Sequence, residues 1–195
     1  DFAEAVRPGL EWLAEDPGRP AFLFLHTYQV HHPYTPEADL LRIFDGGYEG
    51  PLPGLISKEL LNSINRGEVV IDERDLDHIK AAYDAEIRSV DEAFGQLAEG
   101  LEAMGLAGNT LLIFTSDHGE EFGEHGWWGW HSHTLFDELL RVPLVVKLPG
   151  GRAAGDRVTA QVRLTDLVPT VLDRVGLPAP GELDGRSFLP LLDGP

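Results

Sequence analysis

The sequence contains no cysteine, which excludes disulfides, thiolate metal ligands and a cysteine nucleophile within these 195 residues. It also lacks any apolar run that approaches the roughly 20 residues a membrane-spanning helix needs. Basic residues are few: 15 Lys and Arg stand against 33 Asp and Glu, so the formal net charge is −18. Such a charge repels nucleic acid, because proteins bind its phosphates through Lys and Arg. We therefore expect neither a nucleic-acid partner nor a membrane segment in this chain.

The residues that are present are typical of a globular chain, with 43% apolar and 9% aromatic side chains. The length of 195 residues predicts a single domain, 1–195, with a sizeable core. The first residue is not methionine, so we expect the natural sequence to begin further upstream. The sequence indicates neither the compartment nor the oligomeric state.

The most informative stretch is the polar segment between two apolar runs, 110–115 and 142–148. Both runs have strand length, and the first is apolar throughout, as in a strand buried on both faces of a parallel sheet. Ligands bind beyond the carboxyl ends of such strands, which is where Asp117 and His118 stand. A carboxylate and an imidazole suit a divalent cation. The alternative is that Asp117 caps a helix and His118 is a surface histidine.

A second polar segment follows the apolar run 21–26, which also has the character of a strand. Its prolines keep the loop 27–36 extended, and this loop carries His31. For His31 considered alone, an exposed loop histidine is the alternative. Three tryptophans after the central run either wall a pocket or pack beneath their loop: Trp127, Trp128 and Trp130.

The clearest helix is predicted over 76–105, where apolar residues recur every three or four positions. Asp75 or Asp77 could cap its start and Gly105 its end. The other elements expected are a helix over 1–15 that Pro8 interrupts or delays, a short helix over 55–61 with Ser57 as its cap, a strand over 156–164 and a helix from Asp166 to Gly176.

Several motifs together resemble the sulfatase family of the alkaline phosphatase superfamily. Ser116–Glu120 reads SDHGE, Gly123–Gly126 reads GEHG, and Leu135–Leu144 ends in RVPL, all similar to the family pattern. The loop at His31 is similar to the family's histidine followed by a PY pair, and Leu183–Leu192 is similar to the family's LDG ending. The resemblance covers nearly the whole chain.

This resemblance implies an α/β fold with a mixed, mostly parallel sheet flanked by helices and incomplete at its N-terminal side. It also implies that residues of about 37–75 form a variable insertion near the substrate entrance. The chain would then be the C-terminal part of a sulfatase-like catalytic domain.

The resemblance further implies a metal-dependent hydrolase of sulfate esters, carried by small molecules or carbohydrates. Asp117 and His118 would hold the metal, with Ca²⁺ as the first choice and Mn²⁺, Mg²⁺ or Zn²⁺ as alternatives. His31 would contact the sulfate or ester oxygen as hydrogen-bond donor or general acid. A Lys or His that binds the anionic group is expected near Phe136, and His133 matches it better than His131.

In this family the nucleophile is a formylglycine made from Cys or Ser in a C/S-x-P/A-x-R motif, which these 195 residues do not contain. We therefore expect a region outside this chain to supply it, and we expect this part alone to be inactive. The alternatives are a phosphoester or phosphonate monoester hydrolase of the same superfamily, since an Asp-His pair occurs among such relatives, or a catalytically inactive metal-binding or interaction domain.

Overall fold

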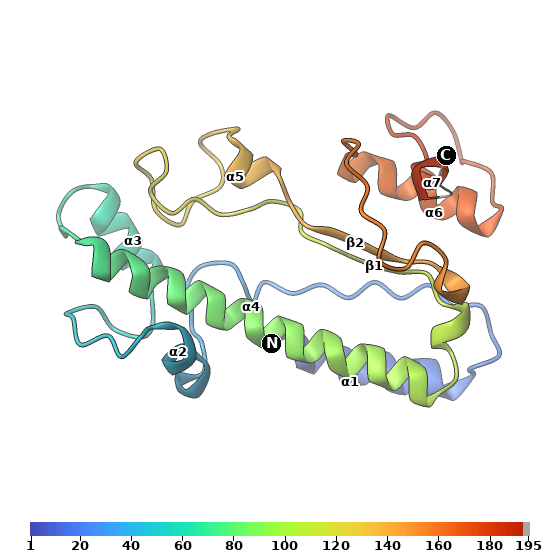
Figure 1. The fold of residues 1–195 in the computed structure, drawn as a ribbon, viewed down its shortest axis with the longest axis horizontal. Coiled ribbons are helices and arrows are strands. Elements are labelled where there is room, and N and C mark those ends of the chain that lie inside the picture. Colours follow the sequence, from blue (N-terminus) through green and yellow to red (C-terminus); the bar gives the residue numbers. More distant parts are fainter. Residues whose placement is uncertain (193–195) are drawn as a thin grey trace. The chain divides into compact units, whose positions relative to one another are not determined.

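The computed structural model describes residues 1–192, which form two compact units (Figure 1). The first unit combines Asp1–Ala107 with His118–Val142, and the second combines Gly108–Asp117 with the described residues from Pro143 onward. The chain thus enters the second unit, returns to the first at His118 and leaves it again after Val142. Within residues 1–192 no helix is both long and apolar enough to cross a membrane.

The first unit is built along α4 (Glu73–Ala103), a helix of 31 residues drawn in green in Figure 1. Asp72 begins it, because its side chain accepts hydrogen bonds from the backbone N–H groups of Arg74 (2.9 Å) and Asp75 (3.0 Å). The Asp75 side chain accepts the N–H of Asp72 in return, at 3.1 Å. Such reciprocal capping satisfies donors that a first turn leaves unpaired. The predicted helix over 76–105 is confirmed, but it begins earlier than expected because Asp72 is the cap.

The helix α1 (Phe2–Glu15) runs along α4 within this unit (Figure 1). A Cβ added to Gly100 of α4 would lie 2.6 Å from a methyl carbon of Leu10, so the helices approach closely at a position without a side chain. Pro8 lies inside α1, and the predicted interruption at this proline is wrong. Burial of an apolar face that includes Phe2 outweighs the one hydrogen bond that proline removes.

Two short helices, α2 (Ala38–Phe44) and α3 (Lys58–Asn65), complete the first unit and enclose its core with α4. Ser57 begins α3 by accepting a hydrogen bond from the Leu60 N–H at 3.1 Å, which confirms the predicted cap. The core consists of buried apolar side chains from these helices and from the loops before them: Tyr34, Leu41, Ile56, Leu61, Ile64, Ile79, Ala81, Ala82 and Ala85.

The predicted strand over 21–26 is extended but belongs to no strand among the described residues. Phe22 and Phe24 are 78% and 74% exposed, whereas Leu23 and Leu25 lie against Gly9 of α1. The alternation is that of a β-conformation with one face covered. A strand also needs a neighbouring backbone to pair with, and residues 1–192 offer none here.

The second unit contains the sheet of the described chain, which has two strands, β1 (Leu112–Thr115) and β2 (Leu144–Lys147). They pair antiparallel, with Leu112 opposite Lys147 and Thr115 opposite Leu144. Both strands were predicted from their apolar runs. The expected mostly parallel sheet is not confirmed, because within residues 1–192 these two strands pair only with each other.

The remainder of the second unit is helical. A 3₁₀ turn, η3 (Leu164–Asp166), leads into α6 (Leu167–Val175), and Gly176 ends α6 with a left-handed φ of +70°, as predicted. The described chain closes with α7 (Leu189–Leu192). Shorter elements are η1 (Ala107–Asn109), α5 (Asp137–Leu140, in the first unit) and η2 (Pro149–Gly151). No strand is assigned over 156–164, contrary to expectation, in this described part of the chain.

Candidate active site

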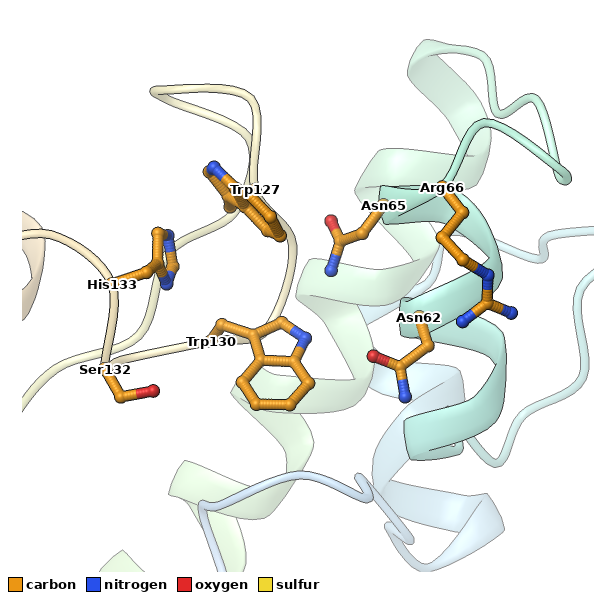
Figure 2. Close-up of a pocket in the computed structure, with 7 residues that line it drawn as sticks. All are labelled: Asn62, Asn65, Arg66, Trp127, Trp130, Ser132 and His133. Atoms are coloured by element: carbon orange, nitrogen blue, oxygen red, sulfur yellow. The ribbon is translucent and has the colours of Figure 1, made fainter.

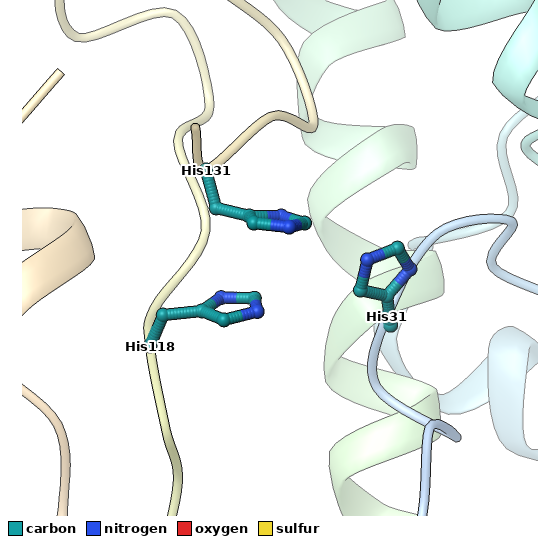
Figure 3. A group of neighbouring side chains, drawn as sticks. All are labelled: His31, His118 and His131. Carbon is teal, nitrogen blue, oxygen red and sulfur yellow. The ribbon is translucent and has the colours of Figure 1, made fainter. Parts of the chain in front are cut away.

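Three histidines from separate segments of the first unit converge (Figure 3). One ring nitrogen from each of His31, His118 and His131 lies within 4.8 Å of the other two. The rings of His118 and His131 stack with centroids 3.8 Å apart, and His31 meets His131 edge-on at 4.9 Å. The sequence predicted a role for each of these residues, and the structure brings them together.

Backbone carbonyls set the tautomers of two of these rings. The Nδ1 atom of His118 lies 2.7 Å from the Gly119 carbonyl oxygen, and that of His31 lies 2.6 Å from the His32 carbonyl oxygen. A carbonyl oxygen only accepts, so in each ring Nδ1 carries the proton and donates it. The lone pair of each neutral ring is therefore on Nε2, the atom suited to bind a cation or to take up a proton.

Gly119 fixes the backbone next to His118. Its N–H donates to the Leu139 carbonyl oxygen at 2.9 Å, which ties this segment to α5. A Cβ at this position would lie 1.9 Å from the Glu138 carbonyl oxygen, so no other residue fits without moving the backbone. The position of His118 therefore depends on Gly119 and on α5.

Glu120 is a buried carboxylate behind the cluster. Its Oε2 accepts a hydrogen bond from the Tyr34 hydroxyl at 3.0 Å, and its Oε1 lies 3.7 Å from Nδ1 of His131. The Nδ1 of buried His32 lies 4.0 Å from Oε2. The last two distances exceed a hydrogen bond, so these interactions are electrostatic. Glu120 thus lies close to one ring of the histidine cluster and to buried His32.

Burial dominates the protonation of this group. It raises the pKa of Glu120 above its usual range, although the hydrogen bond from Tyr34 partly offsets this effect. Burial, followed by the neighbouring His31, lowers the pKa of His32 to about 4. The pKa of Tyr34 is raised by burial and by Glu120. At neutral pH, His32 and Tyr34 are therefore uncharged.

Glu121 serves a different group. It is fully buried and accepts hydrogen bonds from Nε2 of His133 at 3.1 Å and from the backbone N–H groups of His125 at 3.0 Å and Trp127 at 3.3 Å. His133 is held by this carboxylate and lies outside the group formed by His31, His118 and His131. Of the two histidines that the sequence offered near Phe136, His131 lies in the cluster and His133 lies outside it.

Sequence reasoning assigned no role to Glu120 or Glu121, and it treated His32 only as the second choice after His31. Glu120 ends the motif Ser116–Glu120 and Glu121 follows it, but the sequence does not show which carboxylates near a motif are buried. Their burial is the signal, because a carboxylate is removed from water only where other groups satisfy it.

The donor set is suited to a divalent cation. Three imidazoles at this spacing are ligands that Zn²⁺ and Mn²⁺ accept readily, whereas Ca²⁺ prefers oxygen. The carboxylate of Asp117 would add such an oxygen. Asp117 is the last residue of a second-unit segment, and it directly precedes His118 in the sequence. A further group, formed by Glu121, His125 and Glu138, is less suited, because His125 Nδ1 already pairs with Glu138 at 2.5 Å.

Comparison with known proteins agrees with the family that the motifs resemble. Residues 3–177 match the family described as Sulfatase. The chain belongs to the sulfatase family. The multifunctional alkaline phosphatase superfamily protein PehA of Trinickia caryophylli is 30% identical over 205 residues, which is 94% of this chain and 39% of that protein. An N-acetylglucosamine-6-O-sulfatase of Bacteroides thetaiotaomicron is 36% identical over 111 residues, 57% of this chain and 20% of that protein.

The fold is shared as well. The crystal structure of a phosphonate monoester hydrolase of Agrobacterium radiobacter matches with a TM-score of 0.78 and 27% identity over 97% of this chain and 41% of that one. The chain therefore has the fold of the corresponding part of this sulfatase-like, alkaline phosphatase superfamily structure. It spans about two fifths of the length of PehA and of the phosphonate hydrolase.

Proposed function

We propose that this chain forms part of the active site of a metal-dependent hydrolase of sulfate esters. The observation that carries the proposal is the convergence of His31, His118 and His131, three residues from three motif-bearing segments, on one point of the first unit. Membership of the sulfatase family supports the reaction class. The formylglycine nucleophile of this family would be supplied by a segment outside these 195 residues.

The proposed role of each residue follows from the groups that lie around its side chain. His118 and Asp117 would hold a divalent cation, which when bound supplies positive charge to the ester oxygens. Nε2 of His31 would face the transferring group, and after taking up a proton it would donate a hydrogen bond or that proton to an oxygen of the group. His131, which lies in the cluster beside Glu120, would bind the anionic sulfate. The surplus of negative charge on the chain makes such local cations necessary.

The identity of the metal is part of the proposal. The family resemblance makes Ca²⁺ the first choice, in a shell where Asp117 and His118 are joined by further oxygen ligands. If His31 and His131 ligate the ion directly, Mn²⁺ or Zn²⁺ fits better. Restoring activity to chelated protein with each ion in turn distinguishes these arrangements.

Alanine substitutions in the intact protein test the reaction and the roles. We expect His31→Ala and His131→Ala each to lower kcat/KM for 4-nitrophenyl sulfate by about 10²-fold or more, the range for acid–base and charge-stabilising groups. His26→Ala is the matched control, because His26 lies shortly before His31 in the chain but is not a member of the cluster. A loss below threefold in both cluster variants would remove them from the site.

His133→Ala completes the series. The sequence predicted that His133 matches the anion-binding position better than His131, whereas the structure supports His131. We expect the loss in kcat/KM to be larger for His131→Ala than for His133→Ala. The reverse order would show that the bond between His133 and Glu121 (3.1 Å) is broken during catalysis.

A phosphonate or phosphate monoester hydrolase is the second candidate. It is favoured by the Asp117–His118 pair and by the 27% identical phosphonate monoester hydrolase structure. The ratio of kcat/KM for 4-nitrophenyl sulfate to that for a 4-nitrophenyl phosphonate monoester decides between the two reactions. Absence of hydrolysis of either ester by the intact, metal-loaded protein would favour the inactive metal-binding or interaction domain.

A further inference from the structure

A cavity of about 310 Å³ lies in the first unit, between α3 and the loop that carries the tryptophans (Figure 2). Its volume is at the lower end of the range of about 300–1,000 Å³ that is typical of small-molecule sites, so it suits one ring rather than a long chain. It is lined by Asn62, Asn65, Arg66, Trp127, Trp130, Ser132 and His133. None of the functions proposed above uses this cavity.

Two indole rings form the aromatic walls of the cavity. Trp127 and Trp130 line it, whereas Trp128 packs against the core, so the tryptophan-rich loop contributes both to a pocket and to the interior. Asn65 anchors the loop to α3: its amide donates to the Trp128 carbonyl oxygen at 3.1 Å and its side-chain oxygen accepts the Trp128 N–H at 2.9 Å. The walls are therefore held in place by two hydrogen bonds and by core packing.

The rest of the lining is polar. The carboxamide of Asn62 lies across the cavity from Trp130, and Ser132 and His133 lie beside the indoles (Figure 2). Arg66 is paired with Glu68 by hydrogen bonds of 2.8 and 2.9 Å, so its charge is balanced. The cavity is thus suited to a neutral ligand with apolar faces and hydrogen-bonding edges rather than to a bare anion.

The cavity adjoins the histidine cluster through one short segment. Trp130 and Ser132 line the cavity, while His131 between them faces His31 and His118. The Trp130 ring also approaches His32, with centroids 5.6 Å apart. A ligand in the cavity would therefore lie next to the proposed site of ester cleavage.

We propose that this cavity is the subsite for the sugar ring of a sulfated monosaccharide, a proposal that rests on the function proposed above. The C–H face of a pyranose carries partial positive charge and packs on the electron-rich face of an indole. Its hydroxyl groups require donors and acceptors around the edge, which Asn62, Ser132 and His133 provide. The ester group attached to that ring would extend towards His131.

The test compares a sugar sulfate with inorganic sulfate in the intact protein. N-acetylglucosamine 6-sulfate contains both the ring and the anion, whereas inorganic sulfate, used as a competitive inhibitor, contains the anion alone. Trp127→Ala and Asn62→Ala remove one aromatic and one polar contact. Trp12→Ala is the matched control, because Trp12 on α1 is 47% exposed and Trp127 is 45% exposed.

We expect Trp127→Ala and Asn62→Ala each to weaken binding of N-acetylglucosamine 6-sulfate by about tenfold, the effect of one good aromatic or polar contact. The inhibition constant of inorganic sulfate should stay within twofold, and Trp12→Ala should change neither value. An equal change for sugar sulfate and inorganic sulfate, or no change for either, would overturn the subsite.

Unsulfated N-acetylglucosamine separates this proposal from the proposed reaction. Its binding is measured by saturation-transfer NMR, which requires no hydrolysis. Sugar binding that Trp127→Ala abolishes, in a protein that cleaves no ester, would support the subsite and refute the proposed reaction. Ester cleavage without any detectable sugar binding would support the reaction and refute the subsite.

Discussion

Glu120 and Glu121 are neighbours in the chain and both are buried, yet they support different surfaces. Glu120 lies behind His131 in the histidine cluster, and Glu121 holds His133 at the cavity. A buried carboxylate is costly unless it is satisfied, so each of them constrains the groups that surround it. These two residues therefore decide which histidine faces the cluster and which faces the cavity.

The hydroxyl of Tyr34 donates a hydrogen bond to Oε2 of Glu120, at 3.0 Å and out of contact with water. We expect Tyr34→Phe to destabilise the protein by about 1–3 kcal/mol, because a buried carboxylate then loses its hydrogen bond. Urea unfolding measures this loss. Tyr28→Phe is the control, because Tyr28 is exposed. Equal unfolding midpoints for the two variants would show that water replaces the hydroxyl.

The sequence named the three histidines that lie together in the structure, and their roles in a reaction stay a prediction. His31, His118 and His131 were all identified from the sequence, but His133 was judged a better match than His131. The two stand two positions apart, and counting from Phe136 cannot separate them. Their environments differ because His131 lies 3.7 Å from Glu120 whereas His133 lies 3.1 Å from Glu121, and residue spacing alone does not reveal these contacts.

The spacing of apolar residues predicted the long helix α4, but it did not predict all of the residues that α4 buries. Its existence and its end near Gly105 follow from the apolar repeat, and Ile79, Val90 and Leu97 of that repeat are buried. Ile87 of the same repeat is largely exposed. The buried residues of α4 also include four alanines that lie outside this repeat: Ala81, Ala82, Ala85 and Ala93. Alanine adds little to an apolar repeat, so the repeat alone does not show which small residues of α4 are buried.

In the second unit Asp166 organises the start of α6. Its carboxylate accepts the Arg186 N–H at 3.0 Å, the Arg163 N–H at 2.8 Å and the Arg163 guanidinium at 3.2 Å. These hydrogen bonds, with the Arg186 N–H making the largest contribution, hold the pKa of Asp166 below its usual range. Ionised Asp166 thus joins residues 163–166 to the segment around Arg186.

This contact predicts a pH dependence of stability. A carboxyl whose folded pKa lies below its unfolded value of about 3.9 stabilises the fold above that value, and the stabilisation is lost as the pH falls through the folded pKa. The melting temperature of the parent protein should therefore drop more between about pH 5 and pH 3 than that of Asp166→Asn.

Asp39→Asn is the control for this measurement, because Asp39 is an exposed carboxylate on α2 that pairs only with surface Arg42 among its described salt bridges. Its acid-induced drop should equal that of the parent protein. Parallel curves for the parent and Asp166→Asn would contradict the proposed role of Asp166.

At the scale of the whole molecule, two features have opposite effects on the association of one copy of the chain with another. The net charge of −18 keeps copies of the chain apart. The extended segment 21–26, however, exposes Phe22 and Phe24 beside a backbone that joins no sheet within residues 1–192. An exposed apolar strand of this kind is a template for pairing with another chain.

We expect the polypeptide 1–195 by itself to self-associate, and more strongly at high salt, because screening weakens the charge repulsion. Replacing Phe22 and Phe24 by Lys should return it to a monomer, whereas Val70→Lys, at another exposed apolar position, should not. Light scattering coupled to size-exclusion chromatography measures the mass. A monomer at all salt concentrations would contradict this expectation.

Sheet topology was the least predictable feature at this scale. The apolar runs 110–115 and 142–148 do form strands, but 21–26 and 156–164 do not join a sheet within the described residues. An apolar run of strand length indicates that a segment is suited to burial in a sheet. It does not specify the backbone that will pair with it, because that partner is distant in the sequence.

The position of His131 between Trp130 and Ser132 has a consequence for engineering this chain. Substitutions at Trp130 or Ser132 would alter the cavity and leave the ring of His131 in the cluster. A change in the length of this loop would instead displace His131 together with the cavity lining. We therefore expect ligand preference at the cavity to be adjustable by single substitutions here, but not by insertions or deletions.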